Sequence, residues 1–271
     1  PPNILIGSAA GLSFVDFLVH LSPTVVVVLA FSMGAIVLMF RGQLAIPAER
    51  YRQFMARDSA GMVKDARALR RLLTVIAVGL GLFIAHDALH LEPAAVALLI
   101  AASALLWVRP SVEAVLSEVE WNVLLFFGAL FVMVGGLESV GVLGAVAGAI
   151  GGFAQENYLG AMLGLLWGAA LLSAVLDNIP FTVVMIPIIL ELQRQGLEVG
   201  PLWWTLALGV GLGGNGTPIG STAGLIAVSY SERTGRPITF GDWFRRGTLV
   251  TLAGLVVASG LLLALYHLGW L

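Results

Sequence analysis

The 271-residue chain contains no cysteine and few charged residues, and both shortages narrow what the protein can be. Without cysteine there is no disulfide framework, no thiolate metal site and no cysteine nucleophile. Charged residues make up only 11% of the chain, whereas soluble domains carry about 25%, and 59% of the residues are hydrophobic. This composition excludes an ordinary soluble domain and predicts an all-α polytopic membrane protein in a lipid bilayer.

The chain also lacks an initiator methionine and a signal peptide, because it opens on Pro1-Pro2-Asn3 directly in an apolar stretch. We therefore expect a fragment that lacks its N-terminal part and does not transport on its own. Residues 1–19 are too short for a full span and are interpreted as the second half of a broken helix that ends near Asp16. A full span follows at residues 21–40, so residues 1–41 would close a first repeat.

Positive charge gathers in residues 42–71, which lie between apolar runs. A positive segment this close to membrane spans is normally cytoplasmic. We interpret it as a basic cytoplasmic linker, and the many neighbouring spans argue against nucleic-acid binding. The cations in and beside this segment are Arg41, Arg50, Arg52, Arg57, Lys64, Arg67, Arg70 and Arg71.

Residues 72–271 are expected to form a second repeat. If its hairpin is re-entrant, Arg194 alone of the 14 Lys and Arg residues falls outside, as the positive-inside rule asks. A full crossing would instead move Arg233, Arg236, Arg245 and Arg246 outside, so the re-entrant form is favoured and the C-terminus lies outside. The expected elements are spans at 72–89, 94–108 and 121–137, an arm at 141–155, the hairpin at 158–193, a broken helix at 202–230 and a last span at 246–271.

Two polar interruptions stand out in this apolar sequence, residues 173–182 and residues 209–221. A carboxylate at membrane depth, such as Asp177, costs ~2.5–3.5 kcal/mol on insertion scales, so packing alone does not explain it. The glycines and Pro218 of the second interruption cannot comfortably continue a helix. Freed backbone groups are tolerated there only where protein or a wet cavity satisfies them. Secondary transporters build their sites from such broken helices, and we predict a transport site here.

Each candidate residue has a functional and a structural interpretation. Asp177 is either a proton or cation carrier or a carboxylate that caps the second hairpin helix. Asn178 and Thr182 offer neutral oxygens to sodium or cap the hairpin, and the backbone of residues 213–217 is either a cradle or a packing kink. Sodium would be held by Asp177, Asn178 and Thr217, and no cofactor besides a coupling proton or sodium is expected.

Three further features lie outside the two interruptions. His86 and His90 have the spacing of a metal pair, but no third ligand is near, and an interfacial polar patch is favoured. Glu138 lies late in a span and is interpreted as interfacial. Residues 13–20 resemble residues 239–246, which favours an inverted-topology repeat with broken transmembrane helices.

The interruptions also resemble a known family. Residues 176–187 resemble the hairpin signature of the ArsB/NhaD permease family, and residues 213–220 resemble its second broken-helix motif. Residues 1–9 are similar to its first-repeat motif, and residues 120–141 to its span before the arm. The likeness covers nearly the whole chain and is closest to the subgroup that contains the melanosomal P protein and citrate transporter-like permeases.

The resemblance implies a homodimer of scaffold and transport domains, with the site at hairpin tips and broken helices. Members move sodium against protons, or arsenite, antimonite, silicic acid or carboxylates such as citrate. The second motif usually continues with asparagine where this chain has Gly224, which removes one amide ligand. The positions carried over are Asp177, Asn178, Thr182, Gly213, Gly214, Asn215, Gly216, Thr217 and Asn3.

The sequence thus predicts a secondary active ion transporter of a bacterial inner membrane, not an enzyme, coupled to protons or sodium and acting on a small ion or anion. One alternative is a membrane-embedded hydrolase that uses Asp177 with Ser173 or Ser221. The other is a passive channel, which would lack coupling to an ion gradient.

Overall fold

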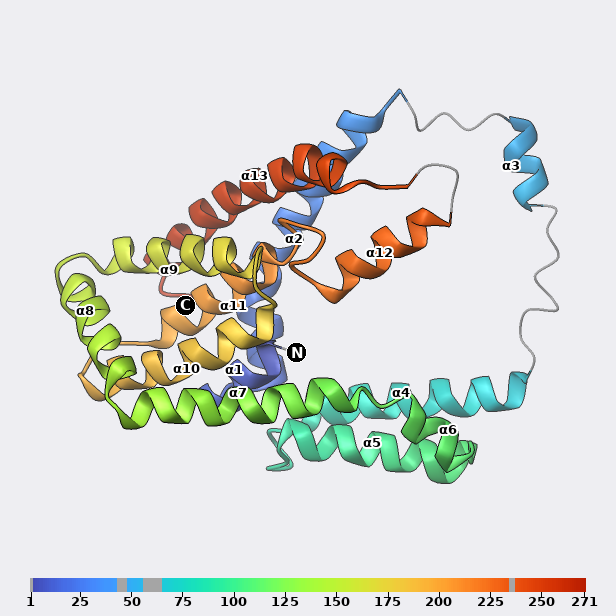
Figure 1. Ribbon diagram of the computed structural model, residues 1–271, viewed down its shortest axis with the longest axis horizontal. Helices are drawn as coiled ribbons and strands as arrows, with labels where there is room; N and C mark the ends of the chain where they lie inside the picture. Colours follow the sequence, from blue (N-terminus) through green and yellow to red (C-terminus); the bar gives the residue numbers. More distant parts are fainter. Residues whose placement is uncertain (1, 43–47, 56–64, 234–236) are drawn as a thin grey trace. The chain divides into compact units, whose positions relative to one another are not determined.

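The computed structural model describes residues 2–42, 48–55, 65–233 and 237–271, and every regular element within them is an α-helix (Figure 1). Four of these helices are long and apolar enough to cross a membrane, which confirms an all-α polytopic membrane protein. Arg57, Lys64 and Arg236, which the charge argument used, lie outside the described residues. The four helices are α2 (Phe14–Phe40), α4 (Ala66–Ala85), α7 (Trp121–Ser139) and α13 (Phe240–His267).

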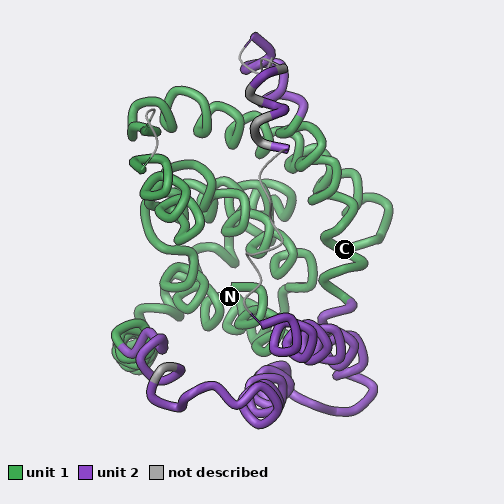
Figure 2. The backbone as a smooth tube through the Cα atoms, turned by 90° about the vertical axis from the view of Figure 1, so that its right-hand side faces the viewer, with its two compact units in different colours: residues 1–12, 16–33, 122–271 green, residues 13–15, 34–121 purple. Residues whose placement is uncertain are grey.

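The described residues form two compact units, which Figure 2 colours separately. Unit 2 (residues 13–15 and 34–121) is built on α4, which packs against α5 (Pro93–Val108). It also contains the short helices α3 (Ala48–Met55) and α6 (Val112–Ser117). The linker expected at 42–71 is therefore partly helical, and α4 takes its last residues.

The early start of α4 has a local cause. The side chain of Asp65 accepts hydrogen bonds from the backbone N–H groups of Ala68 (3.0 Å) and Arg67 (2.9 Å). These two bonds satisfy N–H groups that a helix start leaves free, and they hold the pKa of the Asp65 carboxyl below its ordinary value. A helix that begins at Ala66 follows from this cap.

His86 lies at the turn between α4 and α5, where its side chain is buried. Its Nε2 accepts a hydrogen bond from the backbone N–H of Phe14 (3.1 Å), and its Nδ1 lies 3.0 Å from the carbonyl oxygen of Leu91. Both ring nitrogens are therefore engaged, which does not suit a metal ligand. Among the described residues, no cluster of three or more His, Cys, Asp or Glu side chains could hold a metal ion.

Unit 1 (residues 1–12, 16–33 and 122–271) is organised around α11 (Gly200–Gly213), in which every residue from Pro201 to Val210 is buried. A helix that is apolar on all sides is stable only when other helices surround it. It packs against α1 and α13 and against both helices of the hairpin. Besides α7, α13 and most of α2, unit 1 contains α1 (Pro2–Ala10), α8 (Val142–Glu156), α9 (Tyr158–Ser173), α10 (Asn178–Arg194) and α12 (Thr222–Glu232).

Two helix boundaries differ from the sequence interpretation. The first helix ends at Ala10 rather than near Asp16, because Gly11 turns the chain with φ of +68° and α2 begins at Phe14. The last helix begins at Phe240 rather than at residue 246, because Thr239 and Asp242 form a reciprocal capping box. Helix α2 thus begins within the segment expected to be the first broken helix, and α13 begins within a segment expected to be a connector.

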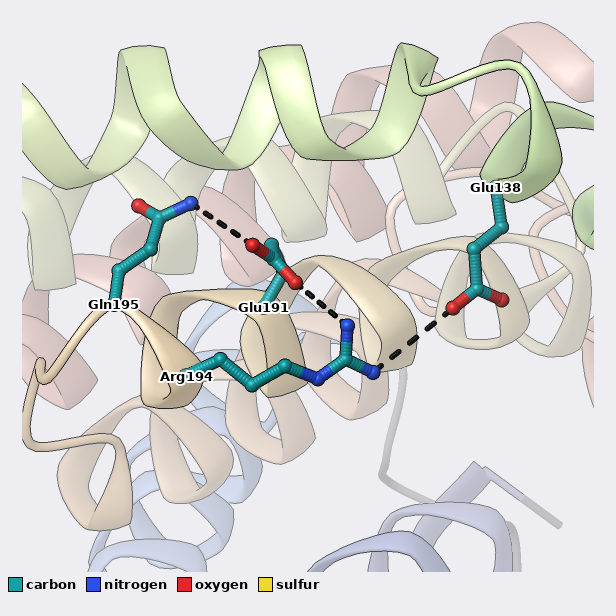
Figure 3. Close-up of polar contacts among 4 residues, drawn as sticks. All are labelled: Glu138, Glu191, Arg194 and Gln195. Atoms are coloured by element: carbon teal, nitrogen blue, oxygen red, sulfur yellow. Dashed lines mark hydrogen bonds and ion pairs between the residues drawn. The ribbon is translucent and has the colours of Figure 1, made fainter.

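A cluster of polar side chains joins the C-terminal ends of α7 and α10 (Figure 3). Arg194 Nη1 lies 2.7 Å from Glu191 Oε2, and its Nη2 lies 4.0 Å from Glu138 Oε1. Gln195 Nε2 donates to the other oxygen of Glu191 at 3.3 Å. The Arg194 and Glu138 side chains are more than half exposed, so the pair contributes little stability and Glu138 lies at the surface of unit 1.

Candidate functional site

The two polar interruptions meet in unit 1. Residues 174–177 join α9 to α10, and residues 214–221 join α11 to α12. The hydroxyl of Thr217 donates to the carbonyl oxygen of Ala174, and a side chain at Gly214 would begin 2.9 Å from the amide of Asn178. The hairpin tip and the break between α11 and α12 therefore form one site.

Close packing of two helices brings them together. A Cβ atom at Gly209 would lie 2.7 Å from the carbonyl oxygen of Leu166, and one at Gly213 would lie 2.3 Å from that of Ala170. Glycines spaced by four residues allow two helix backbones to approach closely, which is a common way for helices to associate in membranes. The glycines that precede the break thus allow α11 to pack closely against α9, and this contact positions the start of the break.

Carbonyl oxygens from the ends of α9 and α11 converge beside Gly220. A Cβ atom there would lie 3.0 Å from Gly214 O and 3.1 Å from both Ser173 O and Ala174 O. The last carbonyl groups of a helix have no partner within it and carry its negative partial charge. We call this group of three carbonyl oxygens the carbonyl cage.

The N-terminal ends of α10 and α12 begin at the same site. Ser221 caps α12 by accepting a hydrogen bond from Gly224 N (3.2 Å). Asp177 occupies the N-cap position of α10, but its carboxylate is exposed and accepts no capping hydrogen bond. Asp177 therefore takes the expected N-cap position, where the helix dipole favours an anion, but its side chain forms no capping hydrogen bond.

Asn178 and Thr182 differ in what they present. Ser173 Oγ donates to Asn178 Oδ1 and lies 3.0 Å from the carbonyl oxygen of Val210, so the Asn178 amide is held at the tip. Thr182 is fully buried and donates to the carbonyl oxygen of Asn178 at 2.8 Å. Thr182 therefore supports α10 from within, while Asn178 faces the break.

Asn3 stands apart from these contacts. It lies on α1, which packs against α10 and α11, and its side chain is exposed. Among the described residues, no hydrogen bond joins it to the hairpin tip or the break. The structure thus places Gly214 beside Asn178 and Thr217 beside Ala174, with Asp177 next to Asn178 in the chain and Asn3 on a neighbouring helix.

Two residues of α13 that the sequence did not indicate as site residues contact the break. Trp243 Nε1 donates to the carbonyl oxygen of Asn215 (3.1 Å), and Thr248 Oγ1 donates to that of Gly216 (2.6 Å). The only sequence signal was the position of Trp243 within the segment that resembles residues 13–20. Thr248 gave no signal of its own, since a single threonine in an apolar span is unremarkable.

The glycine at position 224 has a steric cause. A Cβ atom there would lie 2.7 Å from the carbonyl oxygen of Pro218, closer than real Cβ atoms approach. The first turn of α12 is therefore packed too tightly against the break for an asparagine. The tight packing of the break thus explains why the amide ligand is missing at position 224.

The residues needed for hydrolysis are not brought together. The Ser173 hydroxyl is engaged by Asn178 and Val210, and the Ser221 hydroxyl caps α12. Within the part of the chain that the structure describes, no hydrogen bond joins either hydroxyl to Asp177 or to a histidine. A nucleophile needs a base within hydrogen-bond reach, so this geometry does not support the hydrolase alternative.

Comparisons with known proteins place the chain in a family. The model of a family described as citrate transporter matches residues 1–209. An uncharacterized transporter of Mycobacterium bovis is 36% identical over 263 residues, which are 96% of this chain and 61% of the relative. An uncharacterized transporter of Synechocystis is 30% identical over 282 residues, or 96% of this chain and 62% of that protein.

A more distant match is the P protein of Sus scrofa, 32% identical over 222 residues, which are 77% of this chain and 26% of that protein. No solved structure matches the chain significantly. The chain thus spans about three fifths of the length of its bacterial relatives. These matches confirm the resemblance to the permease family, and the chain belongs to the citrate transporter family.

Proposed function

We propose that this protein is a secondary active transporter that couples a small ion or anion to sodium or protons at the site between the hairpin tip and the break. The carbonyl cage supports the proposal, since the oxygens of Ser173, Ala174 and Gly214 all lie within 3.1 Å of the position that a Cβ atom at Gly220 would take. Hard cations such as sodium are bound by carbonyl, amide and carboxylate oxygens. Asn178, Asp177 and Thr217 add side-chain oxygens around the same junction.

Helix dipoles support a division of the site. The C-terminal ends of α9 and α11 favour a cation at the cage, whereas the N-terminal ends of α10 and α12 favour an anion. Discontinuous helices divide cation and anion binding in this way in secondary transporters. The family's citrate transporter description makes a carboxylate one candidate substrate, beside arsenite.

The membrane arrangement is part of the same proposal. The hairpin is re-entrant, the segment at 42–71 faces the cytoplasm, the C-terminus lies outside, and two copies form a homodimer in a bacterial inner membrane. The asymmetry of the arginines along the chain supports this orientation. The protein is a transporter rather than an enzyme or a passive channel, because an acidic residue at the site provides for coupling.

A proteoliposome assay tests the proposal. The protein is reconstituted with a pH-sensitive dye inside, and sodium or lithium, then arsenite, then citrate are added outside. Alkalinisation of acid-loaded vesicles on adding sodium would establish cation/proton antiport. Sodium- or proton-dependent uptake of arsenite or citrate would establish coupled anion transport. Flux that follows only the substrate's own gradient would contradict the proposal and favour a channel.

A methyl group at Gly220 should weaken binding of the coupling cation. The Cβ of a Gly220→Ala variant would displace cage carbonyls by a few tenths of an ångström. Each hydrogen-bond-like contact to a charge contributes ~1.5–3 kcal/mol, so we expect a roughly tenfold to hundredfold higher half-saturating sodium concentration. Gly168→Ala on α9 is the matched control, because a Cβ there meets nothing within 4 Å. Equal sodium dependence of the two variants would exclude the cage as the cation site.

A further inference from the structure

The break needs partners for carbonyl groups that no helix satisfies, and α13 supplies two of them. Because α11 ends at Gly213, the carbonyls of Asn215 and Gly216 lie beyond its last turn. The indole N–H of Trp243 donates to the first at 3.1 Å, and the hydroxyl of Thr248 donates to the second at 2.6 Å. A carbonyl group without a hydrogen-bond partner is costly at membrane depth. Each of the two donors therefore stabilises the break by satisfying one of these carbonyls.

A glycine gives the indole its position. A Cβ atom at Gly247 would lie 2.9 Å from both Cδ1 and Nε1 of Trp243, one helical turn away. The bare backbone at Gly247 therefore lets the indole lie along α13 and aim its N–H at the break. Trp243, Gly247 and Thr248 together form what we call the α13 clamp.

The clamp fixes the backbone on one side while the hairpin tip fixes it on the other. Thr217 follows directly after Gly216, and its hydroxyl donates to Ala174 O and accepts from Gly220 N (3.1 Å). Consecutive residues of the break are thus bonded in turn to α13 and to α9. A shift of Asn215 or Gly216 would move Thr217 and Gly214, whose carbonyl oxygen belongs to the cage.

We propose that Trp243 and Thr248 are positioning residues, which hold the break so that Thr217 and the carbonyl cage keep their binding geometry. This inference rests on the proposed function, because the property they position is the affinity of the coupling cation. They touch no cation themselves. Both donors are neutral and both act through backbone carbonyls of the break.

Two readouts separate positioning from simple packing. The first is hydrogen–deuterium exchange of residues 214–221 in the purified protein, which requires no transport. The second is the half-saturating sodium concentration for transport in proteoliposomes. Trp243→Phe removes the indole donor and keeps an aromatic ring, and Thr248→Val removes the hydroxyl donor and keeps the branched shape of the side chain. We expect about threefold to tenfold faster exchange and a similar rise in half-saturating sodium, the range for one neutral hydrogen bond.

Matched variants control for the chemistry of each change. Trp121→Phe also removes an indole N–H that donates to a backbone carbonyl at 3.1 Å, that of Leu116. Thr251→Val removes a hydroxyl on α13 that donates within its own helix, to Gly247 O (2.9 Å). Neither should change exchange in residues 214–221. Thr248→Ser keeps the donor and should restore the parent values.

Gly247→Ala tests the geometry with both donors present. Its methyl group should displace the indole and reproduce the effect of Trp243→Phe, and the double variant should add nothing further. Unchanged exchange in Trp243→Phe and Thr248→Val would overturn the clamp, as would faster exchange with unchanged sodium dependence. An unsubstituted protein without any sodium response would contradict sodium coupling instead, and the exchange rates would still decide whether α13 holds the break.

Discussion

Replacing Gly213 by alanine should disrupt the assembled hairpin and break, whereas replacing Gly211 should not. A methyl group at residue 213 would lie 2.3 Å from the carbonyl oxygen of Ala170 and 2.5 Å from its Cα, and both belong to the backbone of α9. No rotamer change relieves such a contact, so α11 must move away from α9. At Gly211, two residues earlier on the same helix, a Cβ atom meets nothing within 4 Å.

The two variants should differ strongly in stability. Overpacking that forces a backbone shift costs about 1–3 kcal/mol or more, and Gly213 lies at the upper end because the clash is with main chain. Gly211→Ala should be neutral or slightly stabilising, since alanine is favoured over glycine in helices by about 1 kcal/mol. Thermal unfolding in detergent measures the difference, and we expect a clearly lower melting temperature for Gly213→Ala alone.

Transport should follow the same order. Because α11 carries the break and α9 carries the hairpin tip, their separation would also take Gly214 away from Asn178. We expect Gly213→Ala to lose coupled transport and Gly211→Ala to retain it. A Gly213→Ala protein that melts and transports like the Gly211→Ala protein would contradict the close helix contact on which the site depends.

Much of this candidate site can be predicted from the sequence, because polar residues and glycine runs stand out in membrane-spanning, apolar sequence. Asp177 and the glycine-rich run at 213–217 conflict with the apolar sequence around them, and a conflict of this kind marks a functional element. Their contact with each other was also expected, since transporter sites combine a hairpin tip with a broken helix. Helices α9 and α10 together run from Tyr158 to Arg194, and their re-entrant arrangement in the membrane stays a prediction.

What the sequence does not reveal are contacts between backbone and distant side chains. Trp243 and Thr248 reach Asn215 and Gly216 only because the axis of α13 passes the break, and no local pattern encodes that approach. The cage is likewise made of carbonyl groups, which every residue has. Side-chain chemistry predicted Asn178 and Thr217, but only tertiary structure can say which carbonyls converge.

Asp177 shows a second limit of what can be predicted from the sequence. An acidic residue just before a helix is a common N-cap, and the sequence of α10 fits that pattern. The side chain nevertheless accepts no hydrogen bond from the first turn. Residue type thus predicted the N-cap position and a capping hydrogen bond, and only the position is present.

Asp177→Asn should therefore abolish cation-coupled transport and leave the fold intact. Asparagine has the shape of aspartate but cannot ionise, so it removes the charge that would bind a proton or sodium. A contact between a charged group and its partner contributes ~1.5–3 kcal/mol, and we expect coupled transport to fall by roughly a hundredfold or to background. Stability without sodium should be unchanged, because no capping bond is lost.

Sodium-dependent stabilisation separates binding from transport in this experiment. A ligand that binds only the folded protein raises its melting temperature by mass action, so sodium should raise that of the parent and not that of Asp177→Asn. Asp65→Asn is the matched control, since Asp65 is also an N-cap and asparagine caps as well as aspartate. We expect it to keep transport and the sodium effect. Normal coupled transport by Asp177→Asn would show that the coupling charge lies elsewhere, and a fall in its sodium-free melting temperature would return Asp177 to a structural role.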